Sequence, residues 1–492
     1  MFRLETAENP QTLRRIAIEP LTRVEGHGKV TLLLDDADRV HQVRLHIVEF
    51  RGFEIFIEGR PFWEVPVTVQ RLCGICPVSH LLAATKAMDL IAGYGSLTPT
   101  AEKLRRLMHY GQVMQSHALH FFHLASPDLL LGFDSDLTRR NIVGVAREFP
   151  EIAKQGVFLR KYGQEVIRHT AGKRIHGTGA VPGGVNKGLT RDERDAMRRD
   201  IDRMIEWALS AVHMVAELHR AKPEFYDHFG EFDSSMMSLV ADDGTMDFYH
   251  GALRALDASG DTIFDQVDYA GYQQVLDEQV KPWSYMKFPH IRSLGPEKGW
   301  YKVGPLARVQ TCDRIPTPLA EMERKKLLAR GNGKPVMGTL HYHWARLIEL
   351  LHSTEVIRDL LDDPDILGTD LMADKGERRA EAVGVIEAPR GTLFHHYRVS
   401  DNDQVTFCNL IVSTTNNNQA MNEAIRAVAT THLDGKTITE GLLNHIEVAI
   451  RAYDPCLSCA THALGKMPLE VDLVDAEGTL VHRARRNMGP ER

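Results

Sequence analysis

The 492-residue chain has few cysteines, no long apolar run and no strong excess of either charge. Its six cysteines are too few for a disulfide scaffold in a chain of this size. No run of about 18 apolar residues occurs, so no membrane-spanning helix is predicted. The net charge of -7 gives no general argument for nucleic acid or an anionic membrane as a partner. The N-terminus is charged and lacks an apolar segment, so no Sec-type signal peptide is expected and the cytoplasm is the expected location.

Apolar periodicity predicts an α+β fold in which helices predominate. The longest predicted helix covers 190–221, with Thr190 as its N-cap and Glu193 at the capping-box position. Further helices are predicted at 78–94, 99–124, 317–330, 338–361, 417–431 and 438–451. Strands are predicted at 28–35, 40–48, 382–387, 392–398 and 405–412, short irregular strands within 230–310, and a hairpin from 469–475 and 479–485. We therefore expect a central bundle of long helices, small β-sheets near the termini and one interwoven core.

Four of the cysteines form two C-x-x-C pairs, Cys73 with Cys76 and Cys456 with Cys459, separated by almost the whole chain. Each pair precedes a predicted helix, whose N-terminus favours negative charge and lowers thiol pKa. A structural zinc site also uses four thiolates, although zinc ribbons keep their pairs close in sequence. A thioredoxin-like redox pair fits poorly, because no βαβ pattern precedes either motif. The spacing alone leaves a catalytic metal and a structural zinc equally open.

The residues around these pairs resemble the large subunit of [NiFe]-hydrogenases over most of the chain, from Glu19 to His462. The resemblance is carried by TRVEGHG (22–28), FRGFEIFIEGR (50–60), RLCGICPVSH (71–80), SHALHFFHL (116–124), EAPRGTL (387–393) and DPCLSCATH (454–462). A single C-x-x-C pair is a weak signal, but six motifs in this order are specific. The resemblance implies the large-subunit fold and an enzyme that cleaves H₂ reversibly and heterolytically.

The resemblance also implies that the four paired cysteines hold a nickel–iron centre. Cys73 and Cys456 would be terminal nickel ligands. Cys76 and Cys459 would bridge nickel to an iron that carries carbonyl and cyanide ligands. Thiolate sulfur suits both of these soft metals.

Further positions match residues that act beside the metals in that family. Glu25 would relay the proton away from a terminal cysteine. A carboxylate suits this role, because partial burial could raise its pKa toward neutrality. Pro389 and Arg390 would lie at the open metal position, where the guanidinium can hydrogen-bond a cyanide. Asp454 would orient that guanidinium.

Thr414 would donate a hydrogen bond to the other cyanide, and His80 would contact a bridging sulfur. A magnesium ion is also implied near the C-terminus. Its ligands would be the Glu54 carboxylate, the Leu410 backbone carbonyl and the His462 imidazole.

The chain departs from the family pattern at two positions beside the metals. Many members carry an acidic residue where this chain has Ser116, and proline where it has Ser413. Both changes alter the surroundings of the centre without removing a ligand. The remaining cysteines, Cys312 and Cys408, match no ligand motif and are expected to pack as small apolar groups.

Large subunits of this family are made with a C-terminal extension, which a dedicated protease removes after nickel insertion. Cleavage would fall between His462 and Ala463, so 1–462 would be one catalytic domain and 463–492 the extension. A maturation protease and nickel-insertion proteins are therefore implied partners.

Electrons must leave the site, and the chain has no cysteines to spare for a cluster, so an iron–sulfur small subunit is expected. The segments DPCLSCATHALG and FCNLIVSTTNNN resemble those of cytoplasmic NAD-reducing soluble hydrogenases. In these enzymes a diaphorase module with flavin and iron–sulfur clusters passes electrons to NAD. No Gly-rich loop follows a predicted strand here, so NAD is expected to bind elsewhere in the complex.

Two other functions account for part of the sequence. The quinone-side subunit of respiratory complex I shares the fold but lacks the cysteine pairs. A non-catalytic assembly protein with a structural zinc would explain the thiolates. It would not explain Glu25, Glu54, Arg390 and His462 in their motifs.

Overall fold

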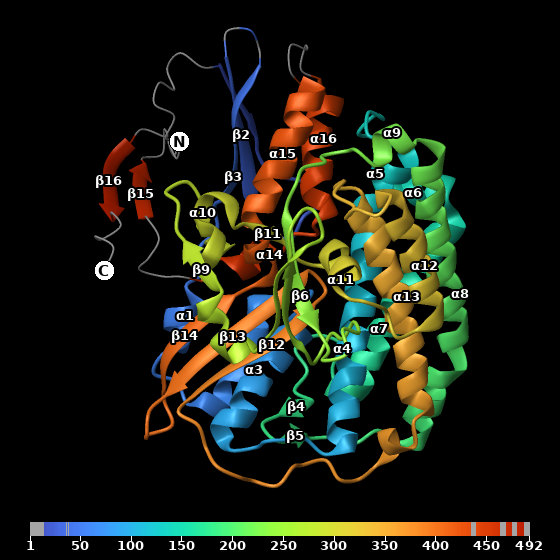
Figure 1. The fold of residues 1–492 in the computed structure, drawn as a ribbon, viewed down its shortest axis with the longest axis vertical. Coiled ribbons are helices and arrows are strands. Elements are labelled where there is room, and N and C mark those ends of the chain that lie inside the picture. Colours follow the sequence, from blue (N-terminus) through green and yellow to red (C-terminus); the bar gives the residue numbers. More distant parts are fainter. Residues whose placement is uncertain are drawn as a thin grey trace.

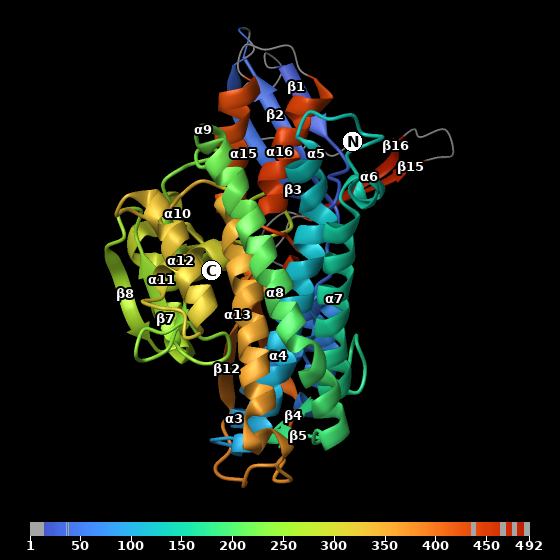
Figure 2. The ribbon, with the colours of Figure 1, turned by 90° about the vertical axis from the view of Figure 1, so that its right-hand side faces the viewer.

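The computed structural model describes residues 14–35, 37, 39–433, 439–462, 469–474 and 480–486. Long helices stand side by side in one part of the molecule, and small sheets pack against them (Figures 1 and 2). The longer helices are α3 (Pro77–Ala92), α4 (Pro99–Leu119), α7 (Pro150–Ala171), α8 (Arg191–Ala221), α12 (Pro318–Leu328), α13 (His341–Asp362), α15 (Asn418–Leu433) and α16 (Glu440–Ala452). The shorter ones are α1 (Phe53–Ile57), α2 (Val65–Val69), α5 (Ser126–Leu131), α6 (Ile142–Glu148), α9 (Pro223–Tyr226), α10 (Gly295–Lys298), α11 (Pro305–Thr311) and α14 (Ser413–Asn416).

The central bundle consists of α4, α7, α8 and α13, which run alongside one another (Figure 2). Helix α8 begins at the predicted capping box, because the Thr190 side chain accepts from the Glu193 N–H and the Glu193 side chain caps Thr190 in return. Helix α13 is buried on most of its surface, with Arg346 and Glu349 among its fully buried residues. In the part of the chain that the structure describes, none of the helices combines the length and the apolarity that crossing a bilayer requires.

Helix α7 is not predicted by the patterns above, and its glycines explain why. Glycine disfavours the interior of a helix by about 1 kcal/mol relative to alanine, and α7 contains Gly156 and Gly163. A Cβ at Gly163 would lie 2.7 Å from the Gly111 carbonyl oxygen and 2.8 Å from the Gln115 nitrogen, both on α4. The close approach of the two helices therefore requires glycines that weaken the local helical signal.

The sheets include the predicted strands and add others. Their strands are β1 (Arg14–Ile18), β2 (Gly28–Leu34) and β3 (Val40–Ile47); β4 (Ala180–Val181) and β5 (Gly184–Val185); β6 (Ser235–Val240), β7 (Ala252–Leu256), β8 (Thr262–Val267) and β11 (Tyr301–Lys302); β9 (Leu276–Gln279) and β10 (Phe288–Ile291); β12 (Glu381–Ala388), β13 (Gly391–Val399) and β14 (Val405–Ile411); and β15 (Leu469–Val474) with β16 (Leu480–Arg486). The predicted hairpin is therefore confirmed as the antiparallel pair β15–β16. The other residues of 463–492, including Ala463, lie outside the described residues.

The middle of the chain is more ordered than the expectation for 230–310. Strands β11, β6, β7 and β8 form one four-stranded sheet, so the sheets are not confined to the two ends. Met237 and Leu239 of β6 belong to one apolar cluster with Val383 and Val385 of β12. Tertiary burial against the β12–β14 sheet thus stabilises strands whose local signal is weak.

Three segments bring the predicted site residues together. Cys73 and Cys76 precede α3, which packs against β12 and β13. The turn between β12 and β13 carries Pro389 and Arg390. The segment after α16 carries the second cysteine pair and forms a bridge between Cys456 and Glu25. Residues from both ends of the chain and from its last third therefore meet in one core.

Candidate metal centre

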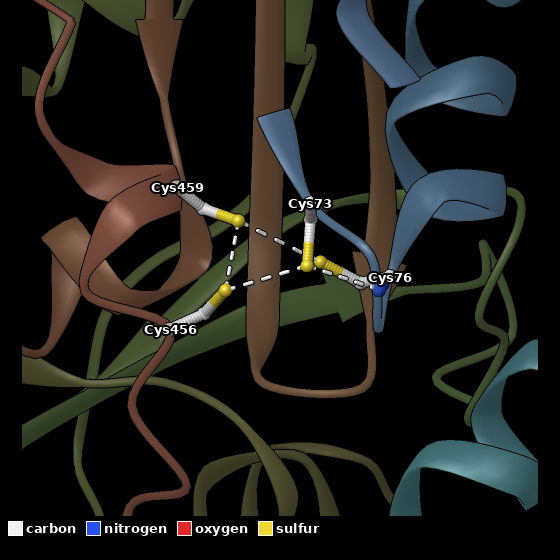
Figure 3. A group of neighbouring side chains, drawn as sticks. All are labelled: Cys73, Cys76, Cys456 and Cys459. Atoms are coloured by element: carbon white, nitrogen blue, oxygen red, sulfur yellow. Dashed lines mark hydrogen bonds between the residues drawn. The ribbon is translucent and has the colours of Figure 1, made fainter. Parts of the chain in front are cut away.

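The four paired cysteines converge in the core, as Figure 3 shows. Their sulfur atoms all lie within 4.8 Å of one another. The Cys73 and Cys456 sulfurs are 3.5 Å apart, and those of Cys76 and Cys459 are 4.0 Å apart. The four side chains are buried, with at most 6% of any residue exposed. A buried group of four sulfurs suits one or two soft metal ions.

Local backbone geometry aims the first pair at this point. Cys76 is the N-cap of α3, and Pro77 at the first helical position fixes the start of the helix. The backbone N–H groups of Ile75 and Cys76 both donate to the Cys73 sulfur, at 3.2 and 3.1 Å. These donors fix the Cys73 sulfur beside the N-terminus of α3.

The second pair lies against the N-terminal segment that carries Glu25. The Leu457 N–H donates to the Glu25 carbonyl at 3.0 Å. Gly26 has a φ of +83°, and a Cβ there would lie 2.7 Å from the Ser458 nitrogen. Only glycine permits this backbone and this approach, which accounts for the glycine that follows Glu25 in the motif.

The thiols do not share one ionisation behaviour. Burial raises the pKa of the Cys456 and Cys459 thiols well above their ordinary value. Hydrogen bonds from Cys456, Cys459 and Cys73 instead lower the pKa of Cys76. Four thiolates this close together need positive charge among them, which a bound divalent metal supplies.

A small cavity lies beside the cysteines. It is lined by Cys76, Ser79, His80, Ala388, Pro389, Arg390, Leu393, Val412, Ser413, Thr414 and Cys456. The cavity therefore joins two of the four sulfurs to the Pro389–Arg390 turn, His80 and Thr414. Its size and mixed lining fit small ligands on a metal ion.

Arg390 is held beside the cavity by Asp454. Its Nε donates to the Asp454 backbone oxygen at 2.5 Å, and its Nη2 donates to Asp454 Oδ1 at 3.0 Å. Burial lowers the pKa of Arg390, but Asp454 and the nearby cysteines outweigh burial and raise it, so the side chain stays charged. Its Nη1 is buried without a hydrogen-bond partner among the described residues. A buried donor left free beside the cavity fits an acceptor on a bound group.

Residues without a predicted role hold the turn that carries Arg390. The Arg308 guanidinium donates to the Ala388 and Pro389 carbonyls at 2.7 and 3.0 Å. The same buried guanidinium pairs with Glu349 at 2.6 Å and Glu387 at 2.8 Å. Of the three charged side chains in this network, only Glu387 lies in a quoted motif, EAPRGTL. Arg308 on α11 and Glu349 on α13 lie outside the quoted motifs.

Glu25 lies partly buried at the second cysteine pair. Its carboxylate accepts hydrogen bonds from the Ser458 hydroxyl and, at 3.2 Å, from the Ser458 N–H. Ser458 stands between Cys456 and Cys459 in sequence. The carboxylate is therefore beside the metal-ligating segment, and the Ser458 hydroxyl is a contact that the sequence analysis does not predict.

His80 begins a chain of buried polar side chains. Its Nδ1 lies 3.1 Å from His395 Nε2, and His395 Nδ1 lies 2.6 Å from the Tyr397 hydroxyl. His80 also hydrogen-bonds the Cys76 thiol and contributes to lowering its pKa. Thr414, in α14, accepts from the Cys456 N–H at 2.9 Å, which leaves its hydroxyl hydrogen able to donate toward the cavity.

Of the three predicted magnesium ligands, His462 has a nitrogen available for a cation, whereas the Glu54 carboxylate already has partners. Glu54 contacts Leu410, but through the Leu410 N–H, which donates to Glu54 Oε1 at 2.9 Å. The Lys287 ammonium also lies 3.2 Å from this oxygen, so a cationic side chain is already present. His462 is buried and its Nδ1 has no hydrogen-bond partner among the described residues, which fits a ligand at that nitrogen.

Cys312 and Cys408 lie away from the cysteine cluster. Both are buried, and burial raises the pKa of the Cys312 thiol to about 12 and that of Cys408 well above its ordinary value. Both therefore remain neutral thiols, as expected of small apolar packing groups.

Comparisons with known proteins agree over nearly the whole chain. A family model described as nickel-dependent hydrogenase matches residues 51–131 and 224–462, and one described as HoxL-like matches residues 15–50. The NAD-reducing hydrogenase HoxS subunit beta of Cupriavidus necator is 46% identical over 487 residues, which cover 96% of this chain and 100% of that protein. A chain of the F420-non-reducing hydrogenase vhc of Methanococcus voltae is 41% identical, and the match covers 93% of this chain and 96% of that protein.

Solved structures show the same relationship. The crystal structure of an NAD⁺-reducing [NiFe]-hydrogenase in the H₂-reduced state matches with a TM-score of 0.90 and 57% identity, covering 91% of this chain and 99% of that chain. A Ni-Fe-Se hydrogenase from D. vulgaris Hildenborough, at 21% identity and a TM-score of 0.73, shares the fold. The predicted α+β large-subunit fold is thereby confirmed, and the chain is a member of the nickel-dependent hydrogenase family.

Proposed function

We propose that this chain is the catalytic large subunit of a [NiFe]-hydrogenase and cleaves H₂ reversibly into a proton and a hydride equivalent. The observation that carries the proposal is the convergence of four buried cysteine sulfurs beside a cavity that Arg390 lines. A structural zinc would need the sulfurs but neither the cavity nor a buried free guanidinium donor. The quinone-side alternative is not favoured, since all four cysteines are present and converge.

Each cysteine has a proposed part in holding the centre. Cys73 and Cys456 would hold nickel as terminal ligands, and Cys76 and Cys459 would be shared between nickel and iron. When bound, the centre supplies the site at which the H–H bond is polarised and split. The chain supplies four thiolates, excludes water by burial and keeps one side of the centre open to the cavity.

The cavity lining is proposed to hold the small iron ligands. Arg390 Nη1 and the Thr414 hydroxyl would each donate to a cyanide, and Pro389 would pack beside them. Asp454 positions Arg390 through the two hydrogen bonds described above. His80 donates to the Cys76 sulfur, with His395 holding the opposite ring nitrogen.

Infrared spectroscopy tests the nickel–iron proposal directly. We expect carbonyl and cyanide stretching bands from the purified protein, together with about one nickel per chain by elemental analysis. The matched control is the same protein from cells grown without nickel, which should lack the nickel. No such bands on a chain that ends at His462 would contradict the proposal and return the structural zinc to first place.

Glu25 is proposed as the group that takes the proton from a terminal cysteine. We expect Glu25→Gln to lower H₂ oxidation by about 100-fold, within the range for a lost general acid or base, while the infrared bands persist. The amide oxygen can still accept from the Ser458 N–H, and the amide NH₂ can donate to the Ser458 hydroxyl, but the amide cannot accept a proton at neutral pH. Hydrogen–deuterium exchange between D₂ and water measures the step.

Glu49→Gln is the matched control for Glu25→Gln. Glu49 is a partly exposed carboxylate that pairs with His27 in the same N-terminal region. We expect its substitution to leave activity and exchange unchanged. Full exchange activity in Glu25→Gln would remove the proton-relay role.

Removal of the C-terminal extension is proposed on the extent of the family match. The nickel-dependent hydrogenase model ends at His462, where the resemblance places the cleavage site. The catalytic domain is then 1–462, and 463–492 is removed by a maturation protease after nickel-insertion proteins have acted.

For magnesium, we propose Glu54, Leu410 and His462 as ligands, on the strength of the unpartnered His462 nitrogen.

The electron acceptor is proposed from the relatives. The relative from Cupriavidus necator is one subunit of an NAD-reducing hydrogenase, and the crystal structure that matches at 57% identity is also of an NAD⁺-reducing enzyme. We infer that the immediate partner is an iron–sulfur small subunit. A diaphorase module with flavin and iron–sulfur clusters then passes electrons to NAD.

A further inference from the structure

A second group of metal-ligating side chains lies where α8 ends and α13 begins. It consists of His219 in the last turn of α8, Asp227 just after α9, and His341 at the start of α13. One donor atom from each lies within 4.8 Å of the other two. His219 Nδ1 is 2.7 Å from Asp227 Oδ1, and His341 Nε2 is 3.2 Å from the same oxygen.

The orientation of His341 places two acceptors opposite each other. Its Nδ1 lies 3.3 Å from the Gly338 carbonyl oxygen, which can only accept, so Nδ1 carries the ring hydrogen. The lone pair of Nε2 then faces the Asp227 carboxylate, and this nitrogen has no hydrogen-bond partner among the described residues. Such a contact is repulsive unless a cation lies between the two atoms.

His341 is 1% exposed, so bulk water does not separate the two acceptors. The geometry suits a metal ion between them. Donor atoms about 2.0–2.1 Å from a tetrahedral zinc lie about 3.3 Å from one another, close to the separation of His341 Nε2 and Asp227 Oδ1.

The remaining contacts of the group resemble the surroundings of a metal site. Arg330 binds the other carboxylate oxygen of Asp227, with its Nε at 3.1 Å from Oδ2, so that Oδ1 faces the two imidazoles. A carboxylate fixed by Arg330 and an imidazole fixed by a backbone carbonyl are typical supports of metal ligands.

We propose that His219, Asp227 and His341 bind one Zn²⁺ ion through Nδ1, Oδ1 and Nε2, with water as the fourth ligand. Binding displaces the Nδ1 proton of His219, and the other nitrogen of that ring, which has no partner among the described residues, takes it up. Neutral imidazoles and a carboxylate are a common zinc ligand set. The ion ties the end of α8 to the start of α13, the helix that carries Glu349 under the Arg390 turn.

Zinc analysis of the purified hydrogenase tests the site. The protein is saturated with Zn²⁺ and dialysed against metal-free buffer, and its zinc content per chain is measured by inductively coupled plasma mass spectrometry. We expect the unaltered protein to retain one zinc more per chain than His341→Gln. The affinity of the variant should fall by more than about 100-fold, since losing even an outer support of a ligand costs about 10–100-fold.

The matched control is His213→Gln. His213 lies on the same helix as His219, and its side chain is 53% exposed. It should retain the same zinc as the unaltered protein. Co²⁺ provides a second readout that needs no variant. Cobalt at this site should give the visible bands of nitrogen and oxygen ligation without thiolate charge transfer.

Two outcomes would overturn the proposal. One is equal zinc in the unaltered protein and His341→Gln. The other is a cobalt spectrum that shows thiolate charge transfer alone, which would place the ion at the cysteines. The cobalt result decides the question even where His341→Gln fails to fold, and it does not depend on hydrogenase activity.

Discussion

Cys456→Ser is expected to abolish H₂ oxidation while leaving the fold largely intact. The Cys456 sulfur lies 3.5 Å from that of Cys73 and 2.7 Å from that of Cys459, so it contacts both pairs. A serine hydroxyl ionises far less readily than a thiol and is a hard ligand, unsuited to a soft metal. We expect loss of nickel from the purified protein and activity reduced by more than about 100-fold. Nickel analysis and H₂-dependent dye reduction measure the two effects.

Cys312→Ser is the matched control for this variant. Cys312 is equally buried, but it lies outside the cluster and its thiol stays neutral. The substitution should therefore leave nickel content and activity near those of the unaltered protein, with some loss of stability from burying a hydroxyl. Retained activity in Cys456→Ser would contradict the assignment of Cys456 as a nickel ligand. Equal loss in both variants would point to a general folding defect.

The sequence predicts the convergence of the four cysteines better than it predicts the residues that support the site. Cys73, Cys76, Cys456 and Cys459 occur as closely spaced pairs, and this local spacing by itself points to metal or redox chemistry. Arg308 is different, because its function comes from contacts with carbonyls about 80 residues away. No local pattern encodes such a contact, so only the folded structure reveals it.

The same difference between local sequence signals and long-range contacts applies to the secondary structure. The capping box of α8 and the strand-like runs that form β12 to β14 are local signals, and they are confirmed. Helix α7 was not predictable in this way, since its glycines serve the approach to α4 rather than the helix itself. Lys287 beside Glu54 is a similar case, because the pairing joins residues that are distant in sequence. Tertiary contacts decide these features, and local propensity does not.

Arg390→Lys is expected to lower H₂ oxidation by about 1,000-fold, at the upper end of the loss seen when one preorganised donor is removed. Arg390 uses Nε and Nη2 to bind Asp454 and still presents Nη1 beside the cavity. A lysine ammonium keeps the charge but cannot do both, because it lacks the planar fork of donors. The carbonyl and cyanide bands should persist with shifted frequencies, since the four sulfur ligands are unchanged. Activity and infrared spectra on one preparation measure both effects.

Asp454→Asn and Arg398→Lys separate charge from position. Arg398 is a half-exposed arginine on β13 that pairs with Glu381, so its substitution should have no effect on activity. Asp454→Asn keeps an oxygen for the guanidinium and removes the charge, so a smaller loss than in Arg390→Lys is expected. If Asp454 acts only by positioning Arg390, the double variant should lose no more activity than Arg390→Lys alone. Additive losses would show that Asp454 has a separate function in the reaction, and unchanged activity in Arg390→Lys would leave the guanidinium a structural part of the turn.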